Sequence, residues 1–287
     1  MKKMSLVVLF SLFVSIVAMP SFDSREPSES TKLVERVKLF RNMYASTGNP
    51  DYVEEVFKAI RSQDREAVFE GLFSLQQLAP KWRDKLGDSV IREVGPLLKE
   101  EDAFLLHSAT ATLVSYGEFA LPVLEDLLII MRRDASGAAV NAADAIAELG
   151  LAANSAQVDL VEALSASVPT RESAIRALDR IGALRPESLR RIRECTQMTD
   201  QSWTFRLNAA KVLLRRDPGD ADAVNVVALA LRTPLSTVRL LALSVLEEIG
   251  LIAQPWGKGL VESVATSDGD ATVRAAAAAM LRPSSQP

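Results

Sequence analysis

Cysteine and histidine are almost missing from this chain of 287 residues, which contains one of each, Cys195 and His107. One cysteine excludes an intramolecular disulfide, and one histidine excludes metal sites that need several imidazoles. His107 lies in an ordinary apolar stretch, and no Gly-x-Ser-x-Gly motif accompanies it. Phosphate-binding glycine loops, Cys-x-x-Cys pairs and calcium loops are also lacking. We therefore expect no catalytic residue, no cofactor, no metal site and a protein that is not an enzyme.

Aromatic residues are few, and the chain has no excess of positive charge. Aromatics make up 6% of the chain, whereas alanine and leucine are abundant, and this balance favours helices over sheets. The formal net charge is −4 and the sequence pI is about 5.3, which argues against general nucleic-acid binding, because that needs a basic surface. With 48% hydrophobic and 24% charged residues, the composition is that of a folded chain.

The N-terminus has the layout of a secretory signal peptide. Lys2 and Lys3 precede an apolar run over residues 5–19, and Pro20 then interrupts it. We expect residues 1–20 to be a cleaved signal peptide and the protein to be exported, to a bacterial periplasm or outside the cell. The alternative is that residues 5–19 stay as a membrane anchor, although a spanning helix needs about 20 residues. Residues 21–30 are polar and predict a flexible leader.

Residues 234–250 form the clearest helical pattern of the chain. Ser236 or Thr237 can cap the N-terminal end, and Gly250 can end the helix in the left-handed conformation. Between them, apolar residues recur with the helical period. The members of this face are Val238, Leu241, Ala242, Val245, Leu246 and Ile249.

The same pattern recurs along most of the chain. Helix ends are predicted 32 to 35 residues apart, with an alanine eight residues before each and a large aliphatic residue four residues before each. Small and large residues in fixed register allow helices to stack closely. The helix ends are Gly117, Gly150, Gly182, Asp217 and Gly250; the alanines are Ala109, Ala142, Ala174, Ala209 and Ala242; the aliphatic residues are Leu113, Ile146, Leu178, Leu213 and Leu246.

Another apolar segment precedes each of these helices, as at residues 120–131, 157–166 and 221–231. The unit is thus two helices joined by tight turns, near 33 residues long. We predict an all-α fold, an α-solenoid of about seven such units over residues 49–283. Residues 31–48 are predicted as an N-terminal capping helix, which covers the open apolar end of the array. Residues 284–287 are predicted as a disordered tail.

In its details the unit resembles HEAT repeats. Prolines near first-helix starts, aspartates in the turns and Val-Arg at the start of second helices carry this resemblance, best at Val238-Arg239 and Val273-Arg274. The units before Gly117 and Gly150 lack the arginine. The resemblance implies a right-handed superhelix whose second helices line the concave face, where partners bind. The prolines are Pro96, Pro122, Pro186, Pro218 and Pro255, and the aspartates are Asp64, Asp134, Asp200, Asp268 and Asp270.

Two groups of arginines are candidate partner contacts. Arg171, Arg206, Arg239 and Arg274 would form a ladder along the groove; in the alternative, each pairs with a turn aspartate, as the repeat family implies. A second cluster surrounds Arg190 and Arg193, which share a helix face. We take Arg190, Arg193, Arg206 and Arg239 as the candidate contacts. Cys195 is interpreted as a small buried apolar group.

Function follows from this architecture only by analogy. The leading hypothesis is an exported, non-enzymatic scaffold whose concave face binds a protein or peptide, with membrane contact only if the N-terminal segment stays uncleaved. One alternative is an accessory subunit of an enzyme complex, because bilin lyases and regulatory subunits occur among HEAT-repeat proteins. Another is binding of an anionic ligand or nucleic acid through the arginine ladder. A uniformly positive groove would favour an anion, and a groove of mixed charge with exposed apolar residues would favour protein.

Overall fold

A computed structural model describes residues 28–133 and 137–282. Across these ranges the chain is helical and contains no strand, so the all-α prediction is confirmed. The predicted signal peptide, most of the leader, Asp134 and the C-terminal tail lie outside the described residues. None of the described helices is both long enough and apolar enough to cross a membrane.

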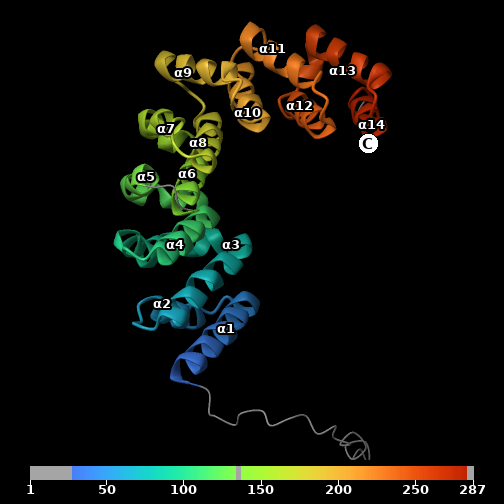
Figure 1. Cartoon of the computed structure of the whole chain (residues 1–287). Coiled ribbons are helices and arrows are strands. Elements are labelled where there is room, and N and C mark those ends of the chain that lie inside the picture. The colour runs from blue at the N-terminus through green and yellow to red at the C-terminus, as the bar shows by residue number, and fades with distance from the viewer. Residues whose placement is uncertain (1–27, 134–136, 283–287) are drawn as a thin grey trace, which may run out of the picture.

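The helices follow one another in pairs and stack into a curved array (Figure 1). The helix α1 (Glu29–Thr47) covers the N-terminal end and packs on both α2 (Pro50–Ile60) and α3 (Arg65–Val94). Later first helices are α5 (Leu124–Arg133), α7 (Gln157–Ala163), α9 (Pro186–Gln197), α11 (Ala221–Ala230) and α13 (Pro255–Ser267). Their second helices are α6 (Gly137–Leu149), α8 (Val168–Ile181), α10 (Trp203–Leu214), α12 (Ser236–Glu248) and α14 (Ala271–Met280), and α4 (Ala103–Tyr116) follows the second part of α3.

Short 3-10 turns connect several pairs: η1 (Gly95–Lys99), η2 (Gly117–Val123), η3 (Gly150–Ala156) and η4 (Leu251–Ala253). The second helices α6, α8, α10, α12 and α14 lie on the inner side of the curve, and the first helices lie outside (Figure 1). The predicted solenoid, in which second helices line the hollow, is therefore the observed architecture. We call this side the inner face.

The predicted register of small and large residues forms the core. All five register alanines have no exposed surface, and the five aliphatic residues at the second position are at most 2% exposed. Gly117, Gly150, Gly182 and Gly250 end their helices with positive φ, a conformation that side chains disfavour. Tyr116 is buried at the end of α4, and its hydroxyl donates to the Leu75 carbonyl at 2.9 Å. Neighbouring units are thus joined by apolar stacking with few polar contacts in the core.

Some boundaries differ from the prediction. Helix α1 begins at Glu29, inside the segment predicted as leader, because the Ser28 hydroxyl accepts from the Thr31 N–H and caps the helix. Helix α12 begins at Ser236 itself after Leu235, without a side-chain cap, so the predicted capping by Ser236 or Thr237 is wrong.

The largest difference is α3, which joins the second helix of one unit to the first helix of the next. It runs on through Pro80. Proline removes one N–H and crowds the preceding turn, yet packing of both parts against their neighbours keeps the helix continuous. Pro96 consequently lies in η1, after the first helix of its unit, and not at the start of that helix.

The stack changes direction between α8 and α10 (Figure 1). Two polar side chains hold the connecting loop. Gln157 is 1% exposed; its amide donates to the Ala183 carbonyl at 2.8 Å and accepts from the Arg185 N–H at 3.0 Å. From the other side, Arg216 donates to the Gly182 carbonyl at 3.1 and 2.6 Å. A cation at a helix C-terminus is favourable, so this contact stabilises the bend.

Candidate binding surface

The inner face begins on the first part of α3. Gly71 faces α2 and not the hollow, since a Cβ there would lie 2.7 Å from the Ile60 side chain of α2. Phe73 lies two residues further, about 200° around the helix, so it points away from α2 into the hollow. Phe69, Gln76 and Pro80 share this direction with Phe73. The corresponding stripe on α4 consists of Phe104, His107, Ser108, Ala111 and Ser115.

Paired polar side chains cover the middle of the inner face, from α4 to α12. Each pair joins two neighbouring second helices. We call them the polar ladder: Asn141 with His107, Arg176 with Asp144, Arg180 with Glu148, and Lys211 and Arg215 with both Asp179 and Glu248. Positive and negative charges alternate along it. The middle of the inner face is therefore of mixed charge, and the cations of the polar ladder are paired with carboxylates of the protein itself.

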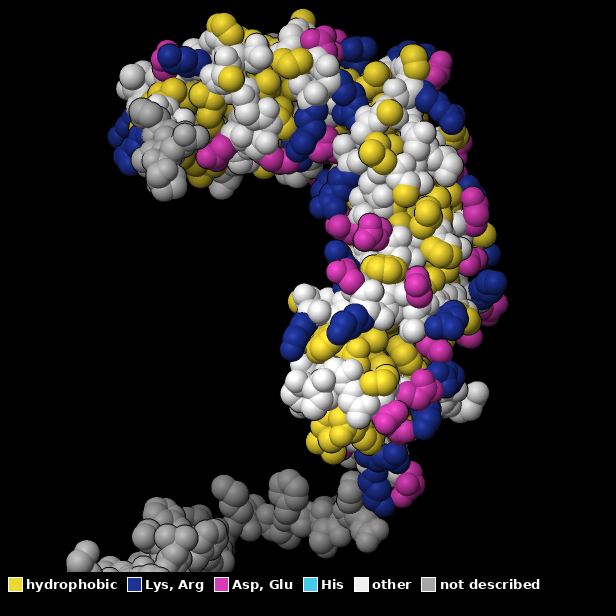
Figure 2. All heavy atoms as spheres, turned by 180° about the vertical axis from the view of Figure 1, so that it is seen from behind, with side chains coloured by type: hydrophobic (Ala, Val, Ile, Leu, Met, Phe, Trp, Pro, Cys, Tyr) yellow, Lys and Arg dark blue, Asp and Glu magenta, His cyan; other side chains and the backbone are white. Residues whose placement is uncertain are grey.

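The N-terminal part of the inner face is different, because large apolar side chains lie open there. Phe73 is 48% exposed and Phe104 is 73% exposed. Arg41 lies over the Phe73 ring at 5.9 Å, and Arg65 lies over both Phe69 and Phe104, at 5.0 and 5.9 Å. We call Phe69, Phe73 and Phe104 the aromatic patch. In Figure 2, hydrophobic side chains with neighbouring Lys and Arg are visible over this lower part of the array.

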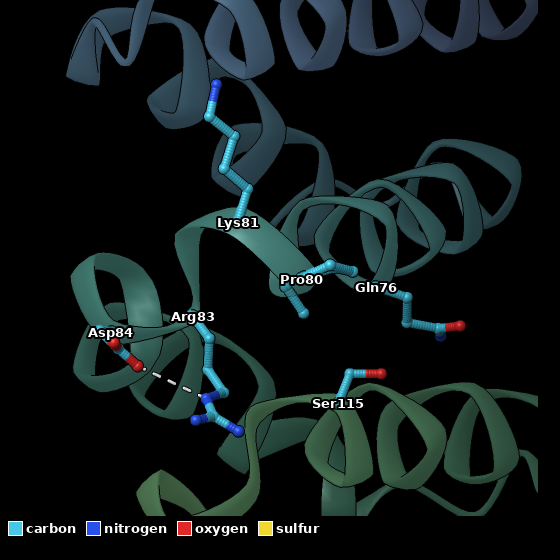
Figure 3. A pocket seen from close by; sticks show the side chains of 7 residues that line it. Gln76, Pro80, Lys81, Arg83, Asp84 and Ser115 are labelled. Atoms are coloured by element: carbon cyan, nitrogen blue, oxygen red, sulfur yellow. Dashed lines mark hydrogen bonds and ion pairs between the residues drawn. The ribbon is translucent and has the colours of Figure 1, made fainter. Parts of the chain in front are cut away.

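A pocket of about 440 Å³ lies next to the aromatic patch, between α3 and α4. Its lining consists of Gln76, Ala79, Pro80, Lys81, Arg83 and Asp84 of α3 and Ser115 of α4, and we call it the Pro80 pocket (Figure 3). Arg83 contacts one carboxylate, that of its neighbour Asp84, at 3.5 Å. The Gln76 amide nitrogen donates to the Thr112 hydroxyl at 3.1 Å, and the amide oxygen of the same side chain is an acceptor. Donors and acceptors are thus both present.

The predicted arginine ladder is largely engaged in contacts within the protein. Arg239 forms a two-point ion pair with Asp268 at 2.8 and 2.9 Å and also donates to the Thr233 carbonyl. The Arg239 and Asp268 side chains are only 11% and 6% exposed. Arg274 donates to the Asp268 carbonyl at 2.5 Å. At these positions the structure favours the alternative in which arginines hold the turns.

Arg206 is also unavailable to a partner, because it is 7% exposed. It donates to the Thr196 carbonyl at 3.1 Å and lies over the Trp203 ring at 4.4 Å. Burial lowers the pKa of the Arg206 guanidinium. Arg171 packs over the Phe205 ring at 5.4 Å. Sequence reasoning could not separate these structural arginines from binding ones, since both uses require the same residue at the same place.

The Arg190 cluster lies on α9, on the outer side of the bend (Figure 1). Arg193 pairs with Asp220 at 2.6 Å and with Asp222 at 3.5 Å, which joins α9 to the start of α11. Arg190 is exposed, and its side chain makes no hydrogen bond or ion pair with the described residues. Of the four candidate contacts, Arg190 therefore has the freest side chain.

The remaining candidates for chemistry have structural surroundings. Burial of Cys195 is complete and raises the pKa of its thiol to about 11, as befits a buried apolar group. His107 belongs to the polar ladder, and Gly137 gives its ring room. Asp220 caps α11. Over residues 28–133 and 137–282, no group of three or more His, Cys, Asp or Glu side chains is arranged to hold a metal ion.

Comparison with known proteins gives structural neighbours only. No family model matches the chain, and no curated protein matches it either. A designed armadillo repeat protein, solved in complex with the peptide (KR)4, is 17% identical with a TM-score of 0.47; the alignment covers 79% of this chain and 97% of that one. An archaeal HEAT-like repeats protein from Thermococcus onnurineus NA1 is 15% identical with a TM-score of 0.41, covering 89% and 97%.

Human deoxyhypusine hydroxylase, an enzyme, is also among these neighbours, at 18% identity and a TM-score of 0.33, with 88% and 96% of the two chains covered. Two of these neighbours are thus named as repeat proteins, and the third is named as an enzyme. At this level of similarity they say nothing about the activity of this chain. Its helical-repeat architecture stands on the paired helices and the buried register described above.

Proposed function

We propose that this chain is a scaffold that binds another protein, or a peptide segment of one, along its inner face. The observation that carries the proposal is the combination on that face of alternating charges and exposed aromatic side chains. Protein interfaces are typically of this kind, with aromatic and arginine residues enriched at their centre. A curved stack of helices also offers one long continuous surface to a partner.

The polar ladder argues against a purely anionic ligand. Arg176, Lys211 and Arg215 face the hollow, but each is paired with a carboxylate of a neighbouring helix. An anion would have to displace these internal pairs to bind there. A protein partner needs no such exchange, because it can contact the aromatic patch and meet the ladder through its own mixed charges.

Binding is tested by crosslinking pull-down with the full chain and two matched variants. Phe73→Asp places a charge on the inner face, and Arg190→Glu reverses a charge on the outer face. Both positions are exposed, so we expect both variants to fold. Loss of the crosslinked partner in Phe73→Asp alone supports the proposal. Loss in Arg190→Glu alone would assign binding to the outer face and contradict it.

We further propose that the protein is exported. The support is the order of charged, apolar and helix-breaking residues over positions 1–20. Cell fractionation with mass spectrometry of the N-terminus tests this. A shortened chain outside the cytoplasm supports cleavage and export, whereas a full-length chain in the membrane fraction would make residues 5–19 an anchor. A full-length cytoplasmic chain would contradict both.

A further inference from the structure

We propose that the aromatic patch and the Pro80 pocket together form one peptide subsite. Its occupant is a partner segment with a large apolar side chain and, about four to five residues away, a carboxylate. This inference rests on the proposed function, because it specifies which part of the inner face binds and what chemistry it selects.

The apolar half of the subsite is the aromatic patch. Phe73 and Phe104 are 48% and 73% exposed, and Arg65 contacts both Phe69 and Phe104, so the three rings form one exposed apolar patch of the kind that marks interaction sites. Arg41 and Arg65 lie over these rings and form ion pairs with Glu70 and Asp102 at 3.1 and 2.7 Å. These cation–π contacts favour one orientation of the rings before a partner binds, which lowers the entropic cost of binding.

Small residues on α4 lie between the patch and the pocket. Ser108, Ala111 and Ser115 follow one another along its inner stripe and are partly exposed. Their short side chains leave space for a peptide main chain to lie across α4. Main-chain amides need both donors and acceptors, and the neighbouring Gln76 side chain and the Ser115 hydroxyl can supply them.

The charged half of the subsite is Arg83. Its side chain is 48% exposed, and its one ion pair among the described residues is the 3.5 Å contact with Asp84, its neighbour in sequence. Arg176 and Arg215 in the polar ladder, by contrast, pair with carboxylates of other helices at 2.8 and 2.6 Å. Arg83 thus keeps a guanidinium edge for a two-point contact with a carboxylate. Lys81 and Arg83 outnumber the one carboxylate of the lining, that of Asp84, so charge complementarity favours an acidic group in the Pro80 pocket.

The spacing of the two halves sets the spacing in the partner. Phe73 and Arg83 are ten positions apart on α3, about 15 Å at a rise of about 1.5 Å per residue. An extended peptide covers about 3.3 Å per residue. An apolar anchor at Phe73 and a carboxylate beside Arg83 are hence separated by about four to five residues.

Fluorescein-labelled octapeptides test this with the full chain. Each contains one Phe in a Ser and Gly background, and a Glu placed two, four or seven residues after it. We expect tightest binding, by fluorescence anisotropy, at the spacing of four. Replacing that Glu with Gln should weaken binding about tenfold, as for loss of a hydrogen bond to a charged group. Phe73→Ala should weaken binding of all peptides, and Arg190→Glu is the control.

Charge exchange makes the test specific. In Arg83→Glu, the Glu peptide should lose about tenfold in affinity and the matching Lys peptide should gain. Equal affinities at all spacings, or no effect of Arg83→Glu, would overturn this inference. If these peptides fail while the crosslinked partner is still lost in Phe73→Asp, the inference is wrong and the proposed function stands. If Phe73→Asp also keeps its partner, both fail.

Discussion

Alanine at one position of each second helix decides how closely the units stack. Ala242 and its four counterparts are completely buried between neighbouring helices, and each is followed four residues later by a large aliphatic side chain. A methyl group permits close approach and the larger residue fills the groove beside it. On α14, Ala277 holds the equivalent position and is also completely buried, whereas Ala275 lies on an exposed side of the same helix.

Substitution of Ala242 tests this role. Ala242→Asp should lower the free energy of unfolding by about 3 kcal/mol or more, because it buries a carboxylate without a partner. Ala275→Asp is the matched control on an exposed site and should stay within about 0.5 kcal/mol. Urea denaturation of both variants measures the difference. An unchanged midpoint for Ala242→Asp would show that this helix face is not packed.

Asp268 couples two units through its pair with Arg239, and the coupling depends on pH. Burial alone would raise the pKa of Asp268, but the Asp270 N–H and the Arg239 guanidinium outweigh it and hold the pKa below its ordinary value. The carboxylate is therefore favoured in the folded state. Its contribution is fully present above the unfolded pKa of about 3.9 and is lost as pH falls through the lower folded value.

We expect Asp268→Asn to lower the free energy of unfolding by about 3 kcal/mol at pH 7, because it leaves the nearly buried Arg239 without its partner. The difference from the unsubstituted chain should shrink below about pH 4. Glu262→Gln breaks an exposed pair with Lys258 and should change stability by less than about 1 kcal/mol. Denaturation at pH 7 and pH 3 measures both. A pH-independent difference would mean that the charge of Asp268 does not matter.

Two glycines of α13 have different surroundings, because one is packed against backbone and the other faces open space. A Cβ on Gly257 would lie 2.1 Å from the backbone oxygen of Leu251, so the close approach of η4 to α13 requires glycine there. A Cβ on Gly259 would meet nothing within 4 Å. The position of a glycine within α13 therefore does not tell whether a side chain would fit there. The distance to the neighbouring backbone determines it.

Alanine substitutions separate these roles. Gly257→Ala should destabilise the protein by about 1–3 kcal/mol, since the clash is with backbone that cannot rotate away. Gly259→Ala should stabilise it by up to about 1 kcal/mol through helix propensity. Thermal denaturation by circular dichroism compares them. Equal effects of the two substitutions would contradict the close packing of η4 on α13.

At the scale of the whole molecule, the bend depends on polar contacts to the loop after α8. Arg216 donates to the Gly182 carbonyl from the following unit, and Gln157 holds the same loop from the preceding one. Stacked units contact mainly their neighbours, so a local change at this loop alters the direction of everything that follows it.

Arg216→Met keeps the apolar stem and removes the donors. We expect the free energy of unfolding to fall by about 2 kcal/mol, with helix content unchanged. The distance distribution from small-angle X-ray scattering should broaden as the two arms of the array vary in orientation. Arg190→Met on the outer face should leave the distribution unchanged. An identical distribution for Arg216→Met would show that apolar stacking alone holds the bend.

The paired helices and the core could be predicted from the sequence, because helical periodicity and the alanine register are local patterns repeated along the chain. Whether a charged residue makes an internal contact or faces a partner depends on the tertiary structure. Arg206 and Arg239 fit a binding ladder as well as a structural one in sequence, and their burial appears only once the units stack. Phe73, Phe104 and Arg83 were missed for the converse reason. Their spacing is that of ordinary helix residues, and only the surfaces left uncovered by neighbouring helices place them together on the inner face.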